Sequence, residues 1–403
     1  MEHLQLWPQL LKEDVWNTVN EYNVLRAHGS GAAFFHNEGD LPAEDDSTWQ
    51  RMYSTQKSMG CVRRYSLMAS MVRMAHANAE THQTLGGTMW VLEQLERALF
   101  TSDSSLLPQG FDGYDAQIAN VRDLRGKPLT GDEVNYASGL IFDSPNYGKA
   151  TDMYMPVGVD VDFIDDVLPS ARYQINQQGF QNGRAGMSVK VYDTQRGPIA
   201  LKPDVFIQFG QAPNTTAQGD VARRPGVPVE SVALGAAGTG SSFTAADAGT
   251  YRYQVVGVNE FGRSAPLTLS GTIAVTAGQS VTFSLGDGTP TARYYEVFRS
   301  TRNGAASTNR FAFKIARDAT GTTAITDSNA YIPGTGRVYL VQQNKEFNVI
   351  QRLLRFMKIR LAMVDASYRF MLLLFASLIV HAPNKACIFI NVGRSDRAPA
   401  YDV

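Results

Sequence analysis

The chain has 403 residues, of which 44% are hydrophobic, so it is long enough for two or more compact units and apolar enough to bury a sizeable core. Its 37 basic and 38 acidic residues leave a formal charge of -1, which excludes a global field that would draw the whole molecule to nucleic acid or to an anionic membrane. The two cysteines, Cys61 and Cys387, are far apart in the sequence and exclude a disulfide scaffold and the common zinc patterns, so synthesis in a reducing cytoplasm is expected.

Residues 1–30 are predicted to form an N-terminal arm with one short helix. Trp7, Leu10, Val15 and Val19 recur near helical spacing, and a glycine-rich stretch then ends the pattern. Acidic residues stand where a signal peptide needs a basic start, so no export sequence is expected.

Residues 31–68 are predicted to form an extended hairpin around an acidic loop. A two-stranded ribbon alone is marginally stable in water, so this one is expected to lie on its own body or on a neighbouring chain. Its aromatic residues are of the kind that is enriched at the centres of protein interfaces. The candidates for such contacts are Phe34, Phe35, Trp49, Arg51 and Tyr53 on the extended parts and Glu38, Asp40, Glu44, Asp45 and Asp46 at the loop.

A long helix is predicted between residues 79 and 100, within a unit that spans 69–128, because apolar residues form a stripe at helical spacing. Gly86 and Gly87 weaken this helix by about 1 kcal/mol each relative to alanine. Close packing against another element would offset that effect.

Residues 129–210 alternate helical and extended patterns, which is typical of a layered unit. The elements expected there are helices near 131–141 and 160–168, a strand at 153–157 and a hairpin within 187–203.

From residue 211 to 341 the composition changes to Gly, Ala, Ser and Thr with alternating Tyr and Val, which predicts an all-β unit. The segment 249–267 resembles the last two strands of a fibronectin type III or bacterial immunoglobulin-like module, and the segments 292–304 and 311–318 resemble its middle strands. Because the strands that normally come last appear first, the unit is either a circularly permuted sandwich or two incomplete modules. Permutation needs fewer assumptions, since insertion into a host loop favours termini that lie close together.

The final segment, residues 342–403, returns to the character of the first half, so the β unit is expected to interrupt one larger fold. A helix is predicted there, with Ile350 and Leu354 on its apolar face and Arg352, Arg355 and Lys358 on a basic face. The basic face is expected to touch phosphate or the acidic hairpin loop of a neighbour, and a merely solvated helix face is an equal alternative. The apolar run at 370–380 is shorter than the ~20 residues that span a bilayer, so a buried strand or helix is expected.

No set of residues predicts catalysis. The six histidines lack the spacing of a metalloprotease helix, and the sequence contains neither a nucleophile elbow nor a phosphate-binding loop. Asp160, Asp162, Asp165 and Asp166 gather at a predicted helix start, where capping and solvation are favoured over a divalent cation. No catalytic residue, cofactor or metal site is therefore expected, and the chain is not predicted to be an enzyme.

The order of arm, extended hairpin, long helix and mixed α/β unit resembles the major capsid proteins of tailed bacteriophages, which have the Hong Kong 97-type fold. The closing segment carries the resemblance best, because an apolar run follows Arg369 and the segment 382–385 precedes a last strand ending at Gly393. The resemblance covers nearly everything outside 211–341. It implies an α+β fold with an arm, an extended loop, a peripheral domain with a spine helix and an axial domain, interrupted by an immunoglobulin-like β-sandwich.

The same resemblance implies a function. It implies self-assembly into hexamers and pentamers that form an icosahedral head shell around packaged double-stranded DNA, which the protein touches non-specifically at most. A portal protein and a scaffold or decoration protein are the other implied partners, and no membrane is implied. The protein is then expected in the virion capsid, after assembly in the cytoplasm of the bacterial host.

Two other functions stay open on the sequence. A tail tube or baseplate component would also carry β-insertions and lack catalytic residues, but the long helix after an extended hairpin argues against it. An adhesin that binds host or environmental glycans through the β unit is the second alternative, with the rest of the chain as a carrier.

Overall fold

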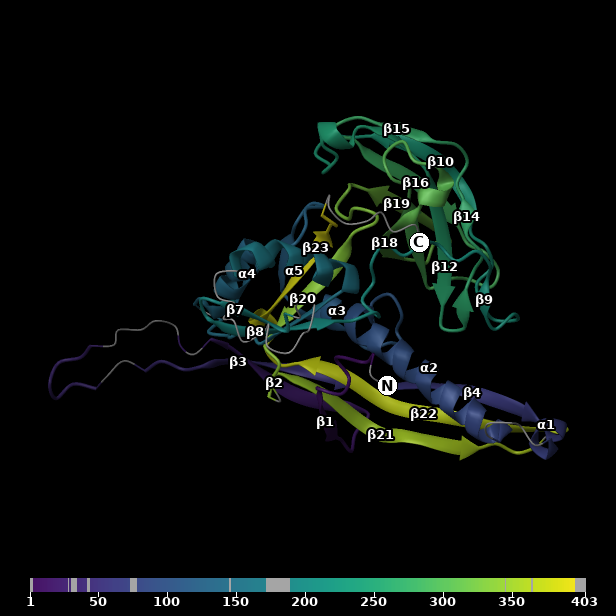
Figure 1. Ribbon diagram of the computed structural model, residues 1–403, viewed down its shortest axis with the longest axis horizontal. Coiled ribbons are helices and arrows are strands. Elements are labelled where there is room, and N and C mark those ends of the chain that lie inside the picture. The colour runs from purple at the N-terminus through teal and green to yellow at the C-terminus, as the bar shows by residue number, and fades with distance from the viewer. Residues whose placement is uncertain are drawn as a thin grey trace, which may run out of the picture.

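The structure is a computed structural model that describes residues 3–27, 29, 35–41, 44–72, 78–144, 146–171, 189–344, 346–363 and 365–395. Helices and strands are mixed throughout, which confirms the α+β prediction at that level. The chain forms a long sheet, a projecting ribbon, a central sheet and a β-domain (Figure 1).

The long sheet has four strands, and the helix α2 (Ala79–Thr101) lies along one of its faces (Figure 1). Its strands, in sheet order, are β1 (Leu11–Asp14), β21 (Asn348–Arg360), β22 (Ser367–Val380) and β4 (Lys57–Ser66). Side chains of β22 alternate, so that Phe370, Leu372 and Leu374 are buried on the α2 side while their neighbours point the other way. The short helix α1 (Leu67–Met71) precedes α2, and α2 confirms the predicted long helix.

Two predicted helices are wrong, because both segments form strands. In the first 30 residues, β1 pairs in parallel with β21, and the chain then continues into a strand of the ribbon. The segment 350–361, with its predicted basic helix face, lies almost entirely in β21. The pairing of β21 with β22 is irregular between Arg352 and Leu354 and again between Leu354 and Met357. These irregularities interrupt the strand's alternation of side chains between two faces, so its apolar residues are spaced nearly as they would be in a helix.

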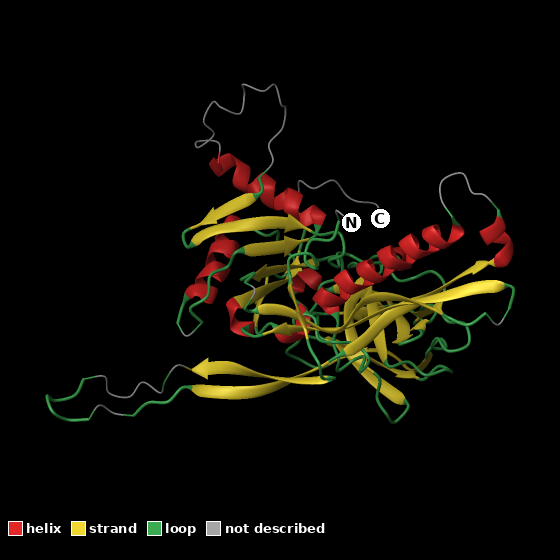
Figure 2. Cartoon of the chain, turned by 90° about the horizontal axis from the view of Figure 1, so that it is seen from below, coloured by secondary structure: helices red, strands yellow, loops and turns green. Residues whose placement is uncertain are grey.

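The ribbon consists of β2 (Val19–Ala27) and β3 (Thr48–Thr55), which pair antiparallel and project away from the sheets (Figures 1 and 2). A hairpin is therefore present, but its first strand lies before the predicted range of 31–68. The returning chain passes from β3 into β4, so the second half of the predicted hairpin is shared between the ribbon and the long sheet.

The central sheet has six strands and a hydrophobic core on each face. Its strands, in sheet order, are β5 (Asn120–Asp123), β23 (Ala386–Val392), β20 (Gly336–Val341), β6 (Asp152–Met155), β8 (Gly197–Pro203) and β7 (Val191–Thr194). Helices α4 (Gly131–Phe142) and α5 (Val157–Ala171) pack on one face, which confirms the two helices predicted there. The strand β6 and the hairpin of β7 and β8 are confirmed as well.

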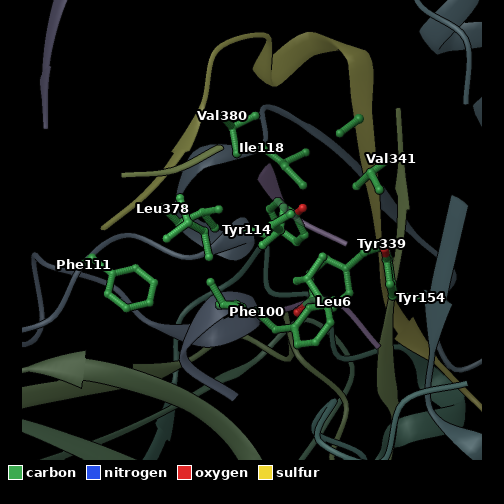
Figure 3. Packing of buried hydrophobic residues seen from close by; sticks show 14 of the residues in the cluster. Leu6, Phe100, Phe111, Tyr114, Ile118, Tyr154, Tyr339, Val341, Leu378 and Val380 are labelled. Carbon is green, nitrogen blue, oxygen red and sulfur yellow. The ribbon is translucent and has the colours of Figure 1, made fainter. Parts of the chain in front are cut away.

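The other face of the central sheet is covered by the end of α2 and by α3 (Tyr114–Gln117). Phe100 of α2 lies against Tyr339 of β20, with ring centroids 4.9 Å apart. Figure 3 shows these side chains together with Leu6 from the N-terminal segment. Because the same core continues onto β22, it joins the central sheet to the long sheet.

The β-domain, residues 211–335, has two facing sheets around a core of its own. Tyr253 of the larger sheet meets Phe283 of the smaller one, with ring centroids 5.6 Å apart. The larger sheet contains β9 (Gln218–Gly219), β12 (Tyr253–Asn259), β13 (Gly262–Arg263), β14 (Leu267–Thr268), β17 (Tyr294–Arg299) and β18 (Arg310–Ala316). The smaller contains β10 (Val229–Ala237), β16 (Ser280–Gly286) and β19 (Thr322–Asp327), and β11 (Gly249–Tyr251) pairs separately with β15 (Ile273–Val275). Short 3-10 helices are η2 (Ala245–Asp247) and η3 (Ala306–Thr308) in this domain and η4 (Pro383–Lys385) before β23.

The two connections to the β-domain lie side by side. Phe209 and Gly336 form a bridge between them, and the N–H of Gly210 donates to the carbonyl of Thr335 at 3.5 Å. The predicted β unit extends to 341 and so includes β20, which the structure places between β23 and β6 in the central sheet.

Candidate interaction surfaces

The ribbon has one open face. Because side chains alternate along a strand, Trp49, Arg51 and Tyr53 of β3 lie on the same face. Trp49 and Tyr53 are each 61% exposed, and Arg51 pairs across the ribbon with Glu21 of β2 at 3.3 Å. Exposed aromatic side chains grouped in this way are typical of a surface that another molecule covers.

The opposite face of the ribbon is seated on the body at its base. The ring of Tyr22 meets that of His381 edge-on with centroids 5.0 Å apart, and the hydroxyls of Ser54 and Ser377 lie 2.7 Å apart. Val24 on this face is buried. A hollow of about 370 Å³ remains between the ribbon base and α3. These contacts fix the base, so the open face has a defined direction.

The tip of the hairpin is strongly acidic. The sequence from Ala27 to Gln50 contains no lysine or arginine. Phe35 is 90% exposed and Leu41 94% exposed beside the acidic side chains, while Phe34 lies outside the described residues. The acidic candidates are all exposed, and they are Glu38, Asp40, Glu44, Asp45 and Asp46.

The basic candidates are paired within the chain. Arg352 contacts Asp14 of β1 at 3.0 Å, and Arg355 binds the same carboxylate. Lys358 contacts Glu80 of α2 at 2.6 Å. These residues therefore fasten β21 to β1 and to α2, and the structure does not bring them near the acidic tip of the same chain (Figure 1).

Glu80 is the centre of one of these networks. Its carboxylate accepts hydrogen bonds from Lys358, from Arg360 and from the hydroxyl of Tyr65 at 3.1 Å. The hydrogen bond from Lys358, followed by that from Arg360, lowers the pKa of Glu80 to about 2. In the same way, the hydrogen bond from Arg355 lowers the pKa of Asp14.

The outer face of the long sheet, which turns away from α2, carries a group of apolar side chains that the described residues leave partly or largely exposed. Strand pairing places Ile359 beside Met371 and Met371 beside Val62, in one row across three strands. Val62 is 56% exposed and Met357 39% exposed. The apolar members of this face are Val62, Met357, Ile359, Met371, Leu373 and Phe375.

The sequence prediction missed this face, because it depends on knowing that β21 is a strand. One signal was present: the run at 370–380 is apolar at consecutive positions, which is typical of a strand covered on both faces. α2 covers one face of that strand, so the other face is also expected to be covered.

The four acidic residues of α5 lie in different environments and do not form one site. Asp162 is buried and contacts Arg394 at 2.6 Å, which holds the C-terminal segment on α5. Asp165 and Asp166 are exposed, and burial raises the pKa of Asp160. Among the described residues, no group of three or more His, Cys, Asp or Glu side chains is placed to hold a metal ion.

Within the described part of the chain, no helix is both long enough and apolar enough to cross a membrane.

No protein-family model matches the sequence. The chain is 27% identical over 414 residues to a protein of Enterococcus phage phiEF24C assigned as its major capsid protein, covering 96% of this chain and 86% of that protein. It is 25% identical over 408 residues to the major capsid protein of Staphylococcus phage K, covering 97% and 86%. Among solved structures, the capsid of a native GTA particle matches with a TM-score of 0.48 and 8% identity, over 96% of this chain and 90% of that one. The capsid of Myoviridae phage XM1 matches with a TM-score of 0.45 and 8% identity, over 96% and 91%.

The sequence relatives match this chain along almost its whole length, including the β-domain. They indicate a structural, non-enzymatic role, and they support for this chain the role of a phage major capsid protein.

Proposed function

We propose that copies of this chain assemble into hexamers and pentamers, which close into an icosahedral head shell around packaged double-stranded DNA. The protein belongs to the virion on this proposal and assembles in the cytoplasm of the bacterial host, with a portal protein and a scaffold or decoration protein as partners. Its contact with DNA is non-specific at most, in keeping with a net charge of -1.

One observation carries the proposal: a single chain holds two uncovered apolar surfaces that it cannot bring together. The open face of the ribbon, with Trp49 and Tyr53, projects from one end of the long sheet. The outer face, with Met357 and Ile359, lies on the half of β21 that runs away from the ribbon (Figures 1 and 2). A second copy supplies the missing cover, with its ribbon packed on the outer face of the first.

The energetics favour a large contact. Obligate interfaces bury about 2,000 Å² or more. Each large apolar side chain that becomes fully buried contributes ~1.5 to 3 kcal/mol. The ribbon supplies area at some distance from the body, so neighbouring copies are joined without moving the central sheet.

We infer further that the chain takes the Hong Kong 97-type fold, with the β-domain as an immunoglobulin-like insertion. In support, a long helix lies on a long sheet, a hairpin projects from it, and a second α/β unit follows in the chain. The bridge between Phe209 and Gly336 brings the ends of the β-domain together, as an insertion requires.

Expression of the full chain in bacteria, followed by sedimentation and negative-stain electron microscopy, tests the assembly. We expect rings of five and six copies and closed shells. Trp49→Asp places a charge on the open face of the ribbon, and the variant is expected to stay folded but to sediment as a single chain. Val221→Asp is the matched control, because this 79% exposed residue of the β-domain lies outside both apolar surfaces.

A compact single chain whose ribbon is protected by its own body would contradict the proposal, and so would stacked tubes in place of shells. If Trp49→Asp assembles as completely as Val221→Asp, the ribbon is not the joining element.

A further inference from the structure

The N-terminal segment is fastened to α2 by one buried carboxylate. Glu96 is fully buried, and its Oε1 accepts the backbone N–H groups of Gln5 at 2.9 Å and Leu6 at 2.6 Å, while its Oε2 accepts that of Trp7 at 3.0 Å. Leu6 is itself buried in the core that contains Phe100 (Figure 3). Hydrogen bonds to an ionised acceptor are about twice as strong as neutral ones, so the position of this segment depends on Glu96.

A second buried carboxyl group faces Glu96. Asp204 comes directly after β8 and is fully buried as well. Its Oδ1 accepts the N–H of Phe206 at 2.7 Å, whereas its Oδ2 receives no hydrogen from the nitrogens or hydroxyls of the described residues. The carboxyl groups of Glu96 and Asp204 are close enough to act on each other: after burial and a backbone hydrogen bond, the charge of Glu96 is a further cause that raises the pKa of Asp204.

Two carboxylates in contact in a buried place cannot both stay ionised, because the like charges repel and neither is hydrated. A single proton held between the two groups removes one charge. It also gives the carboxyl group of Asp204, whose Oδ2 otherwise has no partner among the described residues, a second hydrogen bond.

We propose that Asp204 and Glu96 share one proton and form an acid latch, which holds the N-terminal segment on α2 in acid and loosens it as the proton is lost. The latch acts within one chain, so the proposal goes beyond shell assembly and does not depend on it.

Burial is the largest cause of the shifts in both groups. It raises the pKa of Asp204 to about 7 and raises the pKa of Glu96. A released segment exposes both carboxyl groups to water, where Asp204 titrates at its ordinary 3.8. The contribution of the Asp204 proton to docking is therefore complete below pH 3.8 and is lost as the pH rises to about 7. For one proton, docking weakens by up to about tenfold per pH unit in this window.

The other ionisable groups around Glu96 and Asp204 do not take over the role of the shared proton, which is to remove one of the two negative charges. Burial lowers the pKa of Lys12, the nearest cation on the N-terminal segment. Burial also raises the pKa values of Tyr114 and Tyr154, which keeps both phenols neutral. The remaining charged groups nearby are Arg97, whose guanidinium lies over the ring of Phe206, and Lys202, which is paired with Asp152.

The latch matters for the ribbon, because the fastened segment leads directly into the strands that follow it. β1 begins at Leu11 and forms the edge of the long sheet, and β2 of the ribbon begins at Val19. A loosened latch therefore removes the anchor at the start of both elements.

Hydrogen exchange of the purified full chain tests the latch. Protection of residues 5–10, corrected for the intrinsic effect of pH on exchange, is expected to fall by about 100-fold between pH 5 and pH 8. Asp204→Asn keeps a hydrogen donor for Glu96 but cannot titrate, so its protection is expected to stay constant over this range. Glu96→Gln removes the charged acceptor and is expected to lower protection at both pH values.

Asp160→Asn is the matched control, since Asp160 is a partly buried carboxyl group with a raised pKa on the opposite side of the central sheet. It is expected to keep the full pH dependence of the unmodified chain. Protection that does not change with pH in the unmodified chain overturns the proposal without any variant. Full pH dependence in Asp204→Asn overturns it as well.

Discussion

Glu80 pairs with the charged side chains near the end of β21. It lies on α2 and holds Lys358 and Arg360 on the helix side of the long sheet. Because neighbouring side chains of a strand point in opposite directions, Met357 and Ile359 are then left on the outer face. The pairing with Glu80 and the alternation of the strand thus agree in leaving these apolar side chains on the outer face.

Replacing Glu80 by Gln is expected to lower the free energy of unfolding of the purified chain by about 1 kcal/mol at pH 7, since partly exposed charged hydrogen bonds contribute modestly. The pKa of Glu80 is lowered from 4.5 to about 2, so its contribution is complete above pH 4.5 and disappears as the pH falls towards 2. Urea unfolding of both proteins at pH 7 and pH 2 measures this. A difference between them that is as large at pH 2 as at pH 7 would contradict the assignment.

At the scale of elements, α2 packs tightly against the long sheet at one of its glycines. A Cβ atom on Gly87 would lie 2.7 Å from a methyl of Leu372 and 3.1 Å from Cγ of Arg63. Gly86, one residue earlier, has open space within 4 Å. The packing that was expected to offset both glycines therefore applies at Gly87 alone.

Alanine at these two positions is expected to change stability in opposite directions. Gly86→Ala gains helix propensity without any clash and is expected to stabilise the chain by up to about 1 kcal/mol. Gly87→Ala gains the same propensity but overpacks a buried contact, which costs about 1 to 3 kcal/mol, so a net loss is expected. Thermal unfolding of the two variants gives the comparison, and equal shifts in Tm would contradict the close approach.

The elements that the sequence predicted correctly are those whose signal is local. α2, α4 and α5 have apolar stripes with no competing pattern, and β7 and β8 form a hairpin between neighbouring segments. β1 was missed because it pairs with residues about 340 positions away, such as Leu11 with Val349. β21 was missed although it pairs with the neighbouring strand β22, because two irregularities in that pairing leave apolar spacings close to those of a helix. Tertiary pairing overrode a helical spacing in both.

The candidate surfaces were predicted in the same uneven way. The aromatic and acidic residues of the ribbon could be named from composition, and Trp49 and Tyr53 are indeed exposed. The outer face could not be named, because Val62, Met357 and Met371 come from three strands that the sequence does not place side by side. Their roles in contacts between copies stay a prediction.

At the scale of the whole molecule, the β-domain is held on the body by a few polar contacts as well as by its two connections. Arg125 donates to the carbonyls of Asn329 at 2.9 Å and Ser242 at 2.6 Å, and Lys314 donates to the carbonyl of Thr101 at 3.2 Å. The domain has its own core, and the two cores of the body contain none of its residues. The body is therefore expected to fold without it.

Replacing residues 211–334 with a short Gly-Ser turn is expected to leave a chain that unfolds cooperatively with the circular dichroism of a mixed α/β protein. The matched variant, which lacks 211–341, also loses β20 from the middle of the central sheet and is expected not to fold. Thermal melts followed by circular dichroism distinguish the two. Equal behaviour of both deletions would show that β20 is not part of the body.

The bridge between Phe209 and Gly336 has a consequence for how such a chain changes over time. The main requirement for a segment inserted between these residues is that its two ends lie close together. A genome can gain, lose or exchange a cassette at this one point while every strand of the central sheet keeps its neighbours. The same point is suited to displaying a foreign folded protein once on each copy of the chain.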